Sequence, residues 1–312
     1  MEHYPKQKIE FYRRRSFSEK MNATFDFIRE NWKPLLKYTF YLIMPVCLIQ
    51  TFFMNSFISG YMGLLTSEGK GLPFSANNIL VSYGALMFCS LVGSAIIAGM
   101  VYAMMQTYAT RADGLKDVTL NDFKENLIRN FWKIICISLF LIFLLSVIIL
   151  AAVFLAVTIS EVSLFITIPI FFIFLLLLIP FVMIVPVYIF ERDIRFSDAI
   201  AKAWKLGTET LGGMLALMFV LYVISSIIQT ITMLPWYIVI IVGNVFSLMN
   251  ESQMNQSAVY KFAVYILGLI QSYGMYASST IGTIGLAFHY FHAREKIEGI
   301  SIESNISNFG NL

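Results

Sequence analysis

Charged residues are scarce in this chain: Asp, Glu, Lys and Arg make up 13% of its 312 residues, whereas hydrophobic residues make up 58%. A soluble globular domain carries roughly 25% charged residues. The composition therefore excludes an ordinary soluble domain and predicts an integral membrane protein.

Cysteine is also rare. Cys47, Cys89 and Cys136 are odd in number, lie in or beside apolar stretches and show no CxxC spacing. We therefore expect three reduced, buried side chains that act as small apolar residues, rather than a disulfide or a metal site.

Two of the three histidines, His289 and His292, are spaced to share one face of a helix. Two imidazoles could bind a metal ion, but the nearest carboxylate in sequence is that of Glu295. The neighbours Tyr290 and Phe291 are typical of a membrane interface instead. We predict no metal site and no cofactor.

Catalytic motifs are absent from the sequence. It contains no GxSxG elbow, no Walker A loop and no HExxH pair. The stretch RADGLKD at 111–117 lacks the several aspartates that lipid head-group transferases use. The sequence therefore predicts a protein that is not an enzyme.

Six uncharged intervals run along the chain, at 38–67, 71–110, 134–160, 162–190, 210–250 and 262–293. Each is longer than the roughly 20 residues that a spanning helix needs, so we predict an all-α fold, a polytopic membrane bundle with six transmembrane helices. Nine Lys and Arg residues and no apolar core precede the first interval, which argues against a cleaved signal peptide. Because the spans lack charge, an ion-coupled carrier is disfavoured.

Basic residues favour the cytoplasmic side of a membrane. With six spans, one side receives 20 of the 22 Lys and Arg residues, and only Lys70 and Lys261 fall on the other. We therefore predict that the N-terminus and the C-terminus are both cytoplasmic. Acidic residues alternate with the basic ones, so the pI of about 8.6 does not indicate a nucleic-acid partner.

A pattern recurs before the first, third and fifth intervals. An aromatic residue or Leu is followed by Ser or Asn and then by an acid at 17–19, 120–122 and 196–198. Such residues begin helices, because Ser and Asn cap the first turn and an acid interacts favourably with the helix dipole. Apolar residues then recur with a helical period, which predicts three amphipathic helices on the cytoplasmic side.

Each amphipathic segment is expected to lie along the membrane surface, with Trp at the level of the headgroups and Lys reaching the lipid phosphates. The candidates for contact with membrane lipids, or with a protein partner on the cytoplasmic side, are Phe17, Met21, Phe25, Trp32, Lys33, Trp132, Lys133, Phe196, Trp204 and Lys205.

An amphipathic helix with the two spans that follow it forms one unit of a threefold repeat. We expect a charged cytoplasmic segment at 1–15 and a single membrane domain at 16–298, with units at 16–114, 115–192 and 193–298. A polar C-terminal tail follows at 299–312.

Small residues indicate which spans pack closely. The second and sixth intervals carry them at spacings that let helix backbones approach, which predicts that these two spans lie at the bundle centre. The packing candidates are Ser90, Ser94, Gly99, Ser278, Gly282 and Gly285.

Prolines predict irregular spans. Pro169, Pro180 and Pro186 lie in the fourth interval, where each frees a backbone carbonyl and favours a kink. Pro235 is expected to end the fifth span. The residues from there to Met249 then form either a short interfacial helix or an outward extension, and the sequence leaves both open.

The segment PVYIFERDIRFSDAIAKAWKL, residues 186–206, resembles part of the prokaryotic six-span membrane proteins related to the membrane domain of glycerophosphodiester phosphodiesterases. The residues that carry the resemblance are Pro186, Glu191, Ala199, Trp204 and Gly212. The resemblance implies a protein of a bacterial or archaeal cytoplasmic (inner) membrane. It implies no phosphodiesterase activity, because the catalytic barrel of the fused enzymes is a separate soluble domain that this chain lacks.

Two classes of function remain. The first is a non-enzymatic membrane protein that contacts lipids or protein partners in membrane homeostasis or envelope assembly. The second is a permease subunit that translocates a small or lipid-like substrate with a separate ATPase. In that case SDAIAKAWKLG at 197–207 is the coupling loop, with Asp198 and Lys202 as docking residues.

Overall fold

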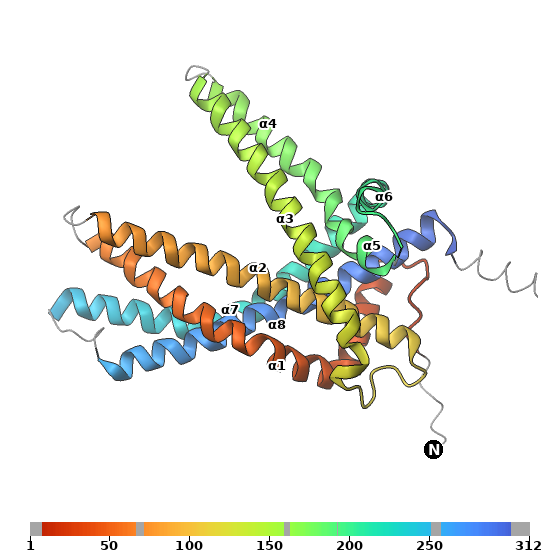
Figure 1. Ribbon diagram of the computed structural model, residues 1–312, viewed down its shortest axis with the longest axis horizontal. Coiled ribbons are helices and arrows are strands. Elements are labelled where there is room, and N and C mark those ends of the chain that lie inside the picture. Colours follow the sequence, from red (N-terminus) through yellow and green to blue (C-terminus); the bar gives the residue numbers. More distant parts are fainter. Residues whose placement is uncertain (1–7, 67–71, 159–162, 192, 251–256, 301–312) are drawn as a thin grey trace, which may run out of the picture. The chain divides into compact units, whose positions relative to one another are not determined.

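The computed structural model describes residues 8–66, 72–158, 163–191, 193–250 and 257–300. Within these ranges all secondary structure is helical, with no strand (Figure 1). The helices are α1 (Phe17–Thr66), α2 (Leu72–Thr110), α3 (Leu120–Thr158), α4 (Ser163–Leu178), η1 (Ile179–Met183), α5 (Ile184–Phe190), α6 (Phe196–Glu209), α7 (Leu211–Asn250) and α8 (Ala258–Ile297). The predicted all-α fold is confirmed for the described residues.

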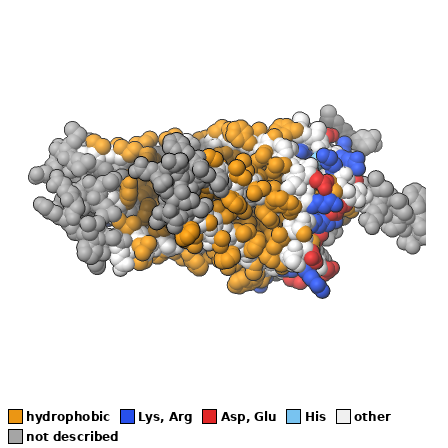
Figure 2. Space-filling view, turned by 90° about the horizontal axis from the view of Figure 1, so that it is seen from above, with side chains coloured by type: hydrophobic (Ala, Val, Ile, Leu, Met, Phe, Trp, Pro, Cys, Tyr) orange, Lys and Arg blue, Asp and Glu red, His pale blue; other side chains and the backbone are white. Residues whose placement is uncertain are grey.

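Five helical segments are long and apolar enough to cross a membrane, which indicates a multi-pass membrane protein. They are Phe17–Tyr61, Asn77–Thr110, Leu120–Phe154, Phe171–Phe190 and Leu211–Gly243. Figure 2 shows that apolar side chains cover much of this face, and that Lys, Arg, Asp and Glu side chains gather in a separate region of it. The sixth predicted span falls in α8, which has 40 residues but is rich in Ser, Gly, Thr and Tyr and is not among the five.

Backbone contacts divide the chain into two compact units. Unit 1 comprises Met1–Glu30, Tyr102–Phe219 and Ile284–Leu312, and unit 2 comprises Asn31–Val101 and Val220–Thr283. The helices α1, α2, α7 and α8 therefore contribute to both units. The threefold division of the membrane domain stays a prediction.

Unit 2 is built around α8, which bonds to the three other helix segments. The Tyr276 hydroxyl of α8 lies 2.5 Å from Gln50 Oε1 of α1 and 3.1 Å from Cys89 O of α2. Ser225 of α7 donates to Ser278 O at 3.0 Å. This position explains the composition of α8, because a helix between other helices needs small and hydrogen-bonding residues more than lipid-like ones.

Close approach in unit 2 occurs at two glycines that are not among the six packing candidates named above. A Cβ added at Gly93 of α2 would collide with the Tyr276 ring, and one at Gly274 of α8 would collide with Thr232 of α7. By contrast, a Cβ at the predicted packing residue Gly282 would meet no atom within 4 Å. Small residues thus allow contact where a large partner side chain stands opposite, which spacing alone does not reveal.

The fourth interval is irregular, as its prolines predict. α4 contains Pro169 and runs alongside α3, η1 is a 3-10 helix that begins beside Pro180, and α5 contains Pro186 (Figure 1). Proline favours such breaks because it removes a backbone donor and its ring clashes with the preceding turn.

The helix does not break at Pro235, because α7 continues through this residue to Asn250. A continuous helix fits the outward extension, and the end of the fifth span at Pro235 stays a prediction. Trp236 and Ile240, which follow the proline, form a buried cluster with Val264 of α8. This packing holds the turns after Pro235 in helical conformation despite the missing donor.

The three amphipathic segments join their spans in different ways. α1 is kinked at Asn31, where φ is −116° and ψ is 19°. α3 is one uninterrupted helix from Leu120. α6 is a separate helix that ends at Glu209, two residues before α7 begins at Leu211.

Gly207 lets α6 approach η1 closely. A Cβ at this position would lie 2.6 Å from Pro180 O and 2.8 Å from Pro180 Cα. The opposing atoms belong to the backbone, so they cannot rotate away. On the same side of α6, Ala199 and Ala203 are fully buried, which makes this a face of small side chains.

We predict that Gly207→Ala destabilises the protein, by about 1–3 kcal/mol, because it overpacks the contact between α6 and η1. The matched control is Gly212→Ala, where a Cβ would meet no atom within 4 Å. Since alanine favours helix over glycine by about 1 kcal/mol, the control should be neutral or slightly stabilising. Thermal unfolding in a mild detergent measures both, and equal effects of the two substitutions would contradict the prediction.

Candidate functional site

Charged and polar side chains from separate parts of the chain meet in unit 1. These side chains form two groups. We refer to Glu191, Lys202, Tyr290, Arg294 and Glu298 as the ion network, and to Lys20, His289 and Thr210 as the histidine chain.

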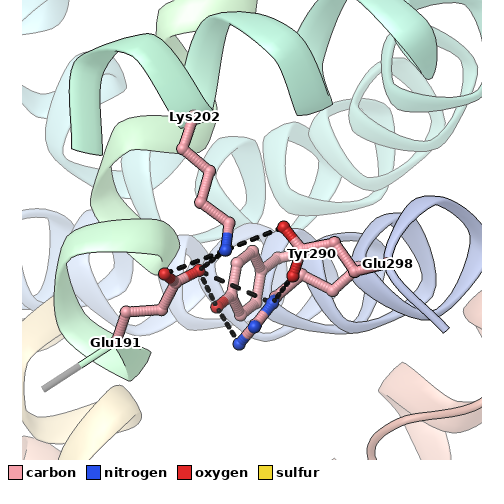
Figure 3. Close-up of polar contacts among 5 residues, drawn as sticks. Glu191, Lys202, Tyr290 and Glu298 are labelled. Atoms are coloured by element: carbon pink, nitrogen blue, oxygen red, sulfur yellow. Dashed lines mark hydrogen bonds and ion pairs between the residues drawn. The ribbon is translucent and has the colours of Figure 1, made fainter. Parts of the chain in front are cut away.

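The ion network joins the end of α5 to α6 and α8 (Figure 3). Lys202 Nζ lies 2.9 Å from Glu191 Oε1 and 2.7 Å from Glu298 Oε1. Arg294 Nε lies 3.5 Å from Glu191 Oε1 and 2.8 Å from Glu298 Oε2. The Tyr290 hydroxyl donates to Glu191 Oε1 at 3.1 Å. Two positive and two negative groups alternate, so the network is neutral as a whole.

Local structure positions these side chains. Glu191 caps the C-terminus of α5 in an extended conformation, and its N–H donates to Val187 O at 3.1 Å. Arg294 and Glu298 stand one helical turn apart at the end of α8, which is the spacing at which helix side chains meet.

Burial and charge act in opposite directions on the pKa values of the network. Burial alone would lower the pKa of Arg294, but Tyr290, Glu298 and Glu191 outweigh it, and that pKa is raised. Burial alone would raise the pKa of Glu298, but hydrogen bonds from Lys202 and Arg294 outweigh it, and that pKa is lowered. The partners therefore keep both groups charged.

The hydrogen bonds of the histidine chain assign the tautomer of His289. Thr210 Oγ1 donates its one hydrogen to Leu206 O at 2.7 Å, so toward His289 Nε2, at 3.0 Å, it accepts. His289 therefore carries its proton on Nε2, and its Nδ1 accepts from the Lys20 ammonium at 3.3 Å. The chain ties α1 to α8 and to the junction of α6 and α7.

The N-terminal segment packs onto unit 1 beside these groups. The Phe11 ring stacks on that of Phe291, with centroids 4.8 Å apart, and on that of Tyr108, with centroids 5.7 Å apart. The Arg15 N–H donates to His292 Nδ1 at 2.9 Å. Part of the segment predicted as a charged cytoplasmic extension is thus held against the helices by aromatic contacts.

Burial is the main cause that lowers the pKa of both histidines, and the positive charge of Lys20 is the next. The pKa falls to about 3 at His289 and to about 4 at His292. Both imidazoles are therefore neutral at pH 7. Among the residues that the structure describes, no group of three or more His, Cys, Asp or Glu side chains is placed to hold a metal ion.

Most candidates for lipid contact lie on the outside of the helices. The exposed fractions are 43% for Phe17, 37% for Phe25, 51% for Trp32, 62% for Trp132 and 38% for Trp204. Lys33 and Lys205 are also exposed, and Met21 is half-buried. The opposite face of α1 is packed inward and carries Lys20, Thr24, Phe27 and Asn31.

Two candidates contact the protein instead. Lys133 Nζ donates to Tyr188 O at 2.5 Å and lies 4.4 Å from the centre of the Tyr188 ring. This ammonium is held by a carbonyl and an aromatic face rather than extended toward a lipid phosphate. Phe196 is half-buried, and its ring lies 5.4 Å from that of Phe140.

The packing candidates and the cysteines also differ among themselves in burial. Gly99, Ser278 and Gly285 are buried, Ser90 and Gly282 are half-buried, and Ser94 is exposed and donates to Leu91 O of its own helix at 3.0 Å. Cys47 and Cys89 are buried free thiols, as expected, but Cys136 is exposed, because it lies on the outer side of α3.

Sequence reasoning did not identify the histidine chain or the ion network. The available signal was the register of Lys20, which lies off the apolar stripe and three and four residues before the buried Ala23 and Thr24. A lysine on the inward face of a helix needs a partner inside the protein. Nothing in the sequence pointed from Lys20 to His289 or from Glu191 to Lys202 and Arg294, since these pairs form only on folding.

We predict that Lys202→Met destabilises the protein by about 1–3 kcal/mol, because it leaves the carboxylates of Glu191 and Glu298 with only Arg294 between them. In the double variant with Glu191→Gln the loss should be smaller than the sum of the single losses, with a coupling of about 0.5–2 kcal/mol. Unfolding in detergent measures the cycle. Lys205→Met, on the same helix but exposed, is the control, and an equal cost for both lysines would contradict the prediction.

The pKa values of the histidines predict a pH dependence. An unfolded chain binds protons at His near pH 6.5, whereas folded His289 does so only near pH 3, so stability falls as the pH falls below about 6.5. Between pH 7 and pH 5, His289 should account for about 1–2 kcal/mol of this loss.

The variant His289→Gln tests this dependence, because glutamine can accept from Lys20 and donate to Thr210 without titrating. Its thermal midpoint should fall less steeply between pH 7 and pH 5 than that of the wild type. The remaining slope is assigned to His292, whose pKa is lowered to about 4. An unchanged slope in the variant would overturn the assignment.

Comparisons with known proteins assign no family and no function to the chain. No family model, curated protein or solved structure matches the chain. The resemblance based on Pro186, Glu191, Ala199, Trp204 and Gly212 stays a prediction. The case for a function therefore rests on the contacts within unit 1 and on the outward surface of the helices.

Proposed function

We propose that this is a six-span protein of a bacterial or archaeal cytoplasmic membrane, with α8 as the sixth span and both termini in the cytoplasm. The asymmetry of Lys and Arg, with 20 of 22 on one side, supports this orientation. The part of α8 in unit 2, Ala258–Thr283, is about 39 Å long at 1.5 Å per residue, enough for the hydrocarbon core. Its Tyr276 side chain bonds to α1 and α2, and its Ser278 carbonyl accepts from Ser225 of α7, so these polar groups are satisfied within the protein.

The proposed role is that of a non-enzymatic membrane protein that acts through contacts with lipids and with a partner on the cytoplasmic side. The observation that carries this proposal is the outward position of the aromatic residues at the entry to each odd-numbered span. Phe17, Phe25 and Trp32 of α1, Trp132 of α3 and Trp204 of α6 are all more than a third exposed. Side chains of this kind gain most at the level of lipid headgroups.

A cytoplasmic partner has the outer face of α6 available to it. Asp198, Trp204, Lys205 and Glu209 are exposed there, whereas Ala199 and the other residues of the opposite face are packed on the protein. Membrane homeostasis and envelope assembly are the processes that such a scaffold would serve.

The permease alternative has weaker support. In that reading Lys202 of α6 would dock a separate ATPase, but its ammonium is engaged by Glu191 and Glu298 within the chain. Asp198 is exposed and remains compatible with docking.

The relation to the membrane domain of glycerophosphodiester phosphodiesterases is part of the proposal. Its support is that the shared residues have packing or bonding roles: Pro186 and Ala199 are buried, and Glu191 bonds to α6 and α8. Such roles belong to a shared architecture and carry no phosphodiesterase chemistry.

We predict that the variant Phe17→Ser, Phe25→Ser, Trp32→Gln retains less native lipid than the wild type after purification in mild detergent. The three side chains face outward, so the substitution removes apolar surface offered to lipid without opening a cavity in the protein. Its thermal midpoint should also fall in detergent and recover less when lipid is added back. Mass spectrometry of the bound lipids and a thermal scan measure the two effects.

The control variant carries Ser18→Ala, Asn22→Ala and Arg29→Ala, which change exposed polar residues of the same helix segment. It should keep the lipids and the response to added lipid. If the triple aromatic variant retains lipid and responds to added lipid as this control does, the proposed lipid contact is contradicted.

A further inference from the structure

The Lys20 side chain is buried without a compensating negative charge. The residue is 4% exposed, and its ammonium donates to His289 Nδ1 at 3.3 Å. No carboxylate of the described residues lies within ion-pair distance of it. His289 is a neutral acceptor, so it satisfies one N–H but leaves the charge uncompensated, which is unfavourable in the interior.

Two further donors lie close to Lys20. His292 accepts the Arg15 N–H on Nδ1, so in the neutral ring Nε2 carries the proton and is available as a donor. The rings of His289 and His292 have centroids 6.1 Å apart. His289, His292 and Lys296 stand at positions i, i+3 and i+7 of α8 and so share one face of the helix, and His289 of this face contacts Lys20.

Positive charges predominate around His292. Those that act most strongly on the pKa of His292 are Lys20, Lys296, Arg15 and Arg14, all positive. In the ion network, by contrast, each cation is matched by a carboxylate within 4 Å. The excess of positive charge is therefore local to this group of residues.

One end of the group lies at the protein surface. Lys296 is exposed, His292 is half-buried and Lys20 is buried, so the donors run from the surface inward. Gly213 is exposed and stands beside Lys20, because a Cβ there would lie 3.4 Å from Lys20 Nζ and 3.8 Å from His289 Cε1. Because Gly213 has no side chain, this residue does not cover the Lys20 ammonium.

We infer that Lys20, His292 and Lys296 form a binding site for a phosphate oxyanion, supplied either as free phosphate or as the phosphodiester of an anionic phospholipid headgroup. Lysine ammonium groups and a neutral imidazole N–H offer several donors to one anion, and bonds from charged donors to phosphate are short and strong. The anion supplies the negative charge that Lys20 lacks within the protein. The site uses none of the outward aromatic residues, so it stands apart from the proposed lipid contact.

The test has two arms that separate the sources of the phosphate. In the first, the full chain in a zwitterionic detergent is titrated with sodium phosphate at constant ionic strength, with sodium chloride as the balancing salt. In the second, it is placed in nanodiscs of phosphatidylcholine with or without phosphatidylglycerol. The thermal midpoint is followed in both, because a ligand that binds the folded state raises it.

Three variants and one control are compared. Lys296→Met removes an exposed donor and should weaken binding about tenfold, since one charge-assisted hydrogen bond is lost. His292→Leu, which removes the imidazole donor, should weaken it by a similar factor, and Lys20→Met should abolish the response. Lys124→Met, which removes an exposed lysine of α3, should respond as the wild type does.

A midpoint raised by phosphate alone identifies a free anion as the ligand, and one raised by phosphatidylglycerol alone identifies a lipid headgroup. Either result supports the site if Lys296→Met loses the response and Lys124→Met keeps it. No response in either arm, or equal responses in these two variants, overturns the inference. If Lys20→Met does not fold, Lys296→Met and His292→Leu still decide the question.

Discussion

The rest of the structure depends on one constraint: in lipid, a polar group must find its partner inside the protein. This requirement places α8, with Tyr276 and Ser278, between the other helix segments of unit 2. It also orients α1, which turns Lys20 inward and Phe17 and Trp32 outward. The lipid surroundings thus account both for the less apolar helix α8 at the centre of unit 2 and for the apolar surface of the protein.

The same constraint explains how much of the fold could be predicted. Long uncharged intervals require helices in lipid, so the all-α fold followed from charge distribution alone. Irregularities depended on packing as well. At Pro180 the chain forms a 3-10 helix, whereas at Pro235 α7 continues because Trp236 and Ile240 are held in a buried cluster. A proline in the sequence shows that one backbone N–H donor is missing. Whether the helix breaks there depends on how the neighbouring residues pack.

Site residues were harder to predict, because the role of a charged side chain depends on neighbours far along the chain. Lys33 and Lys133 follow Trp in nearly identical contexts, yet Lys33 is exposed and Lys133 is bound to Tyr188. The segment around Glu191 stood out in the sequence, but its partners on α6 and α8 did not. Local patterns report which face of a helix is apolar. They do not report which distant residue meets the other face.

The ion network and the histidine chain of unit 1 differ in their charge balance. The ion network is closed, since each charge has an opposite charge beside it, and a closed neutral network joins α5, α6 and α8 without demanding a ligand. The surroundings of Lys20 are not balanced in this way, because among the described residues its ammonium bonds to a neutral imidazole and has no carboxylate within ion-pair distance. Buried charge of one sign is costly, and a protein that keeps it gains when an ion of the other sign binds. The ion network therefore joins three helices without a ligand, whereas at Lys20 the binding of an anion can alter stability.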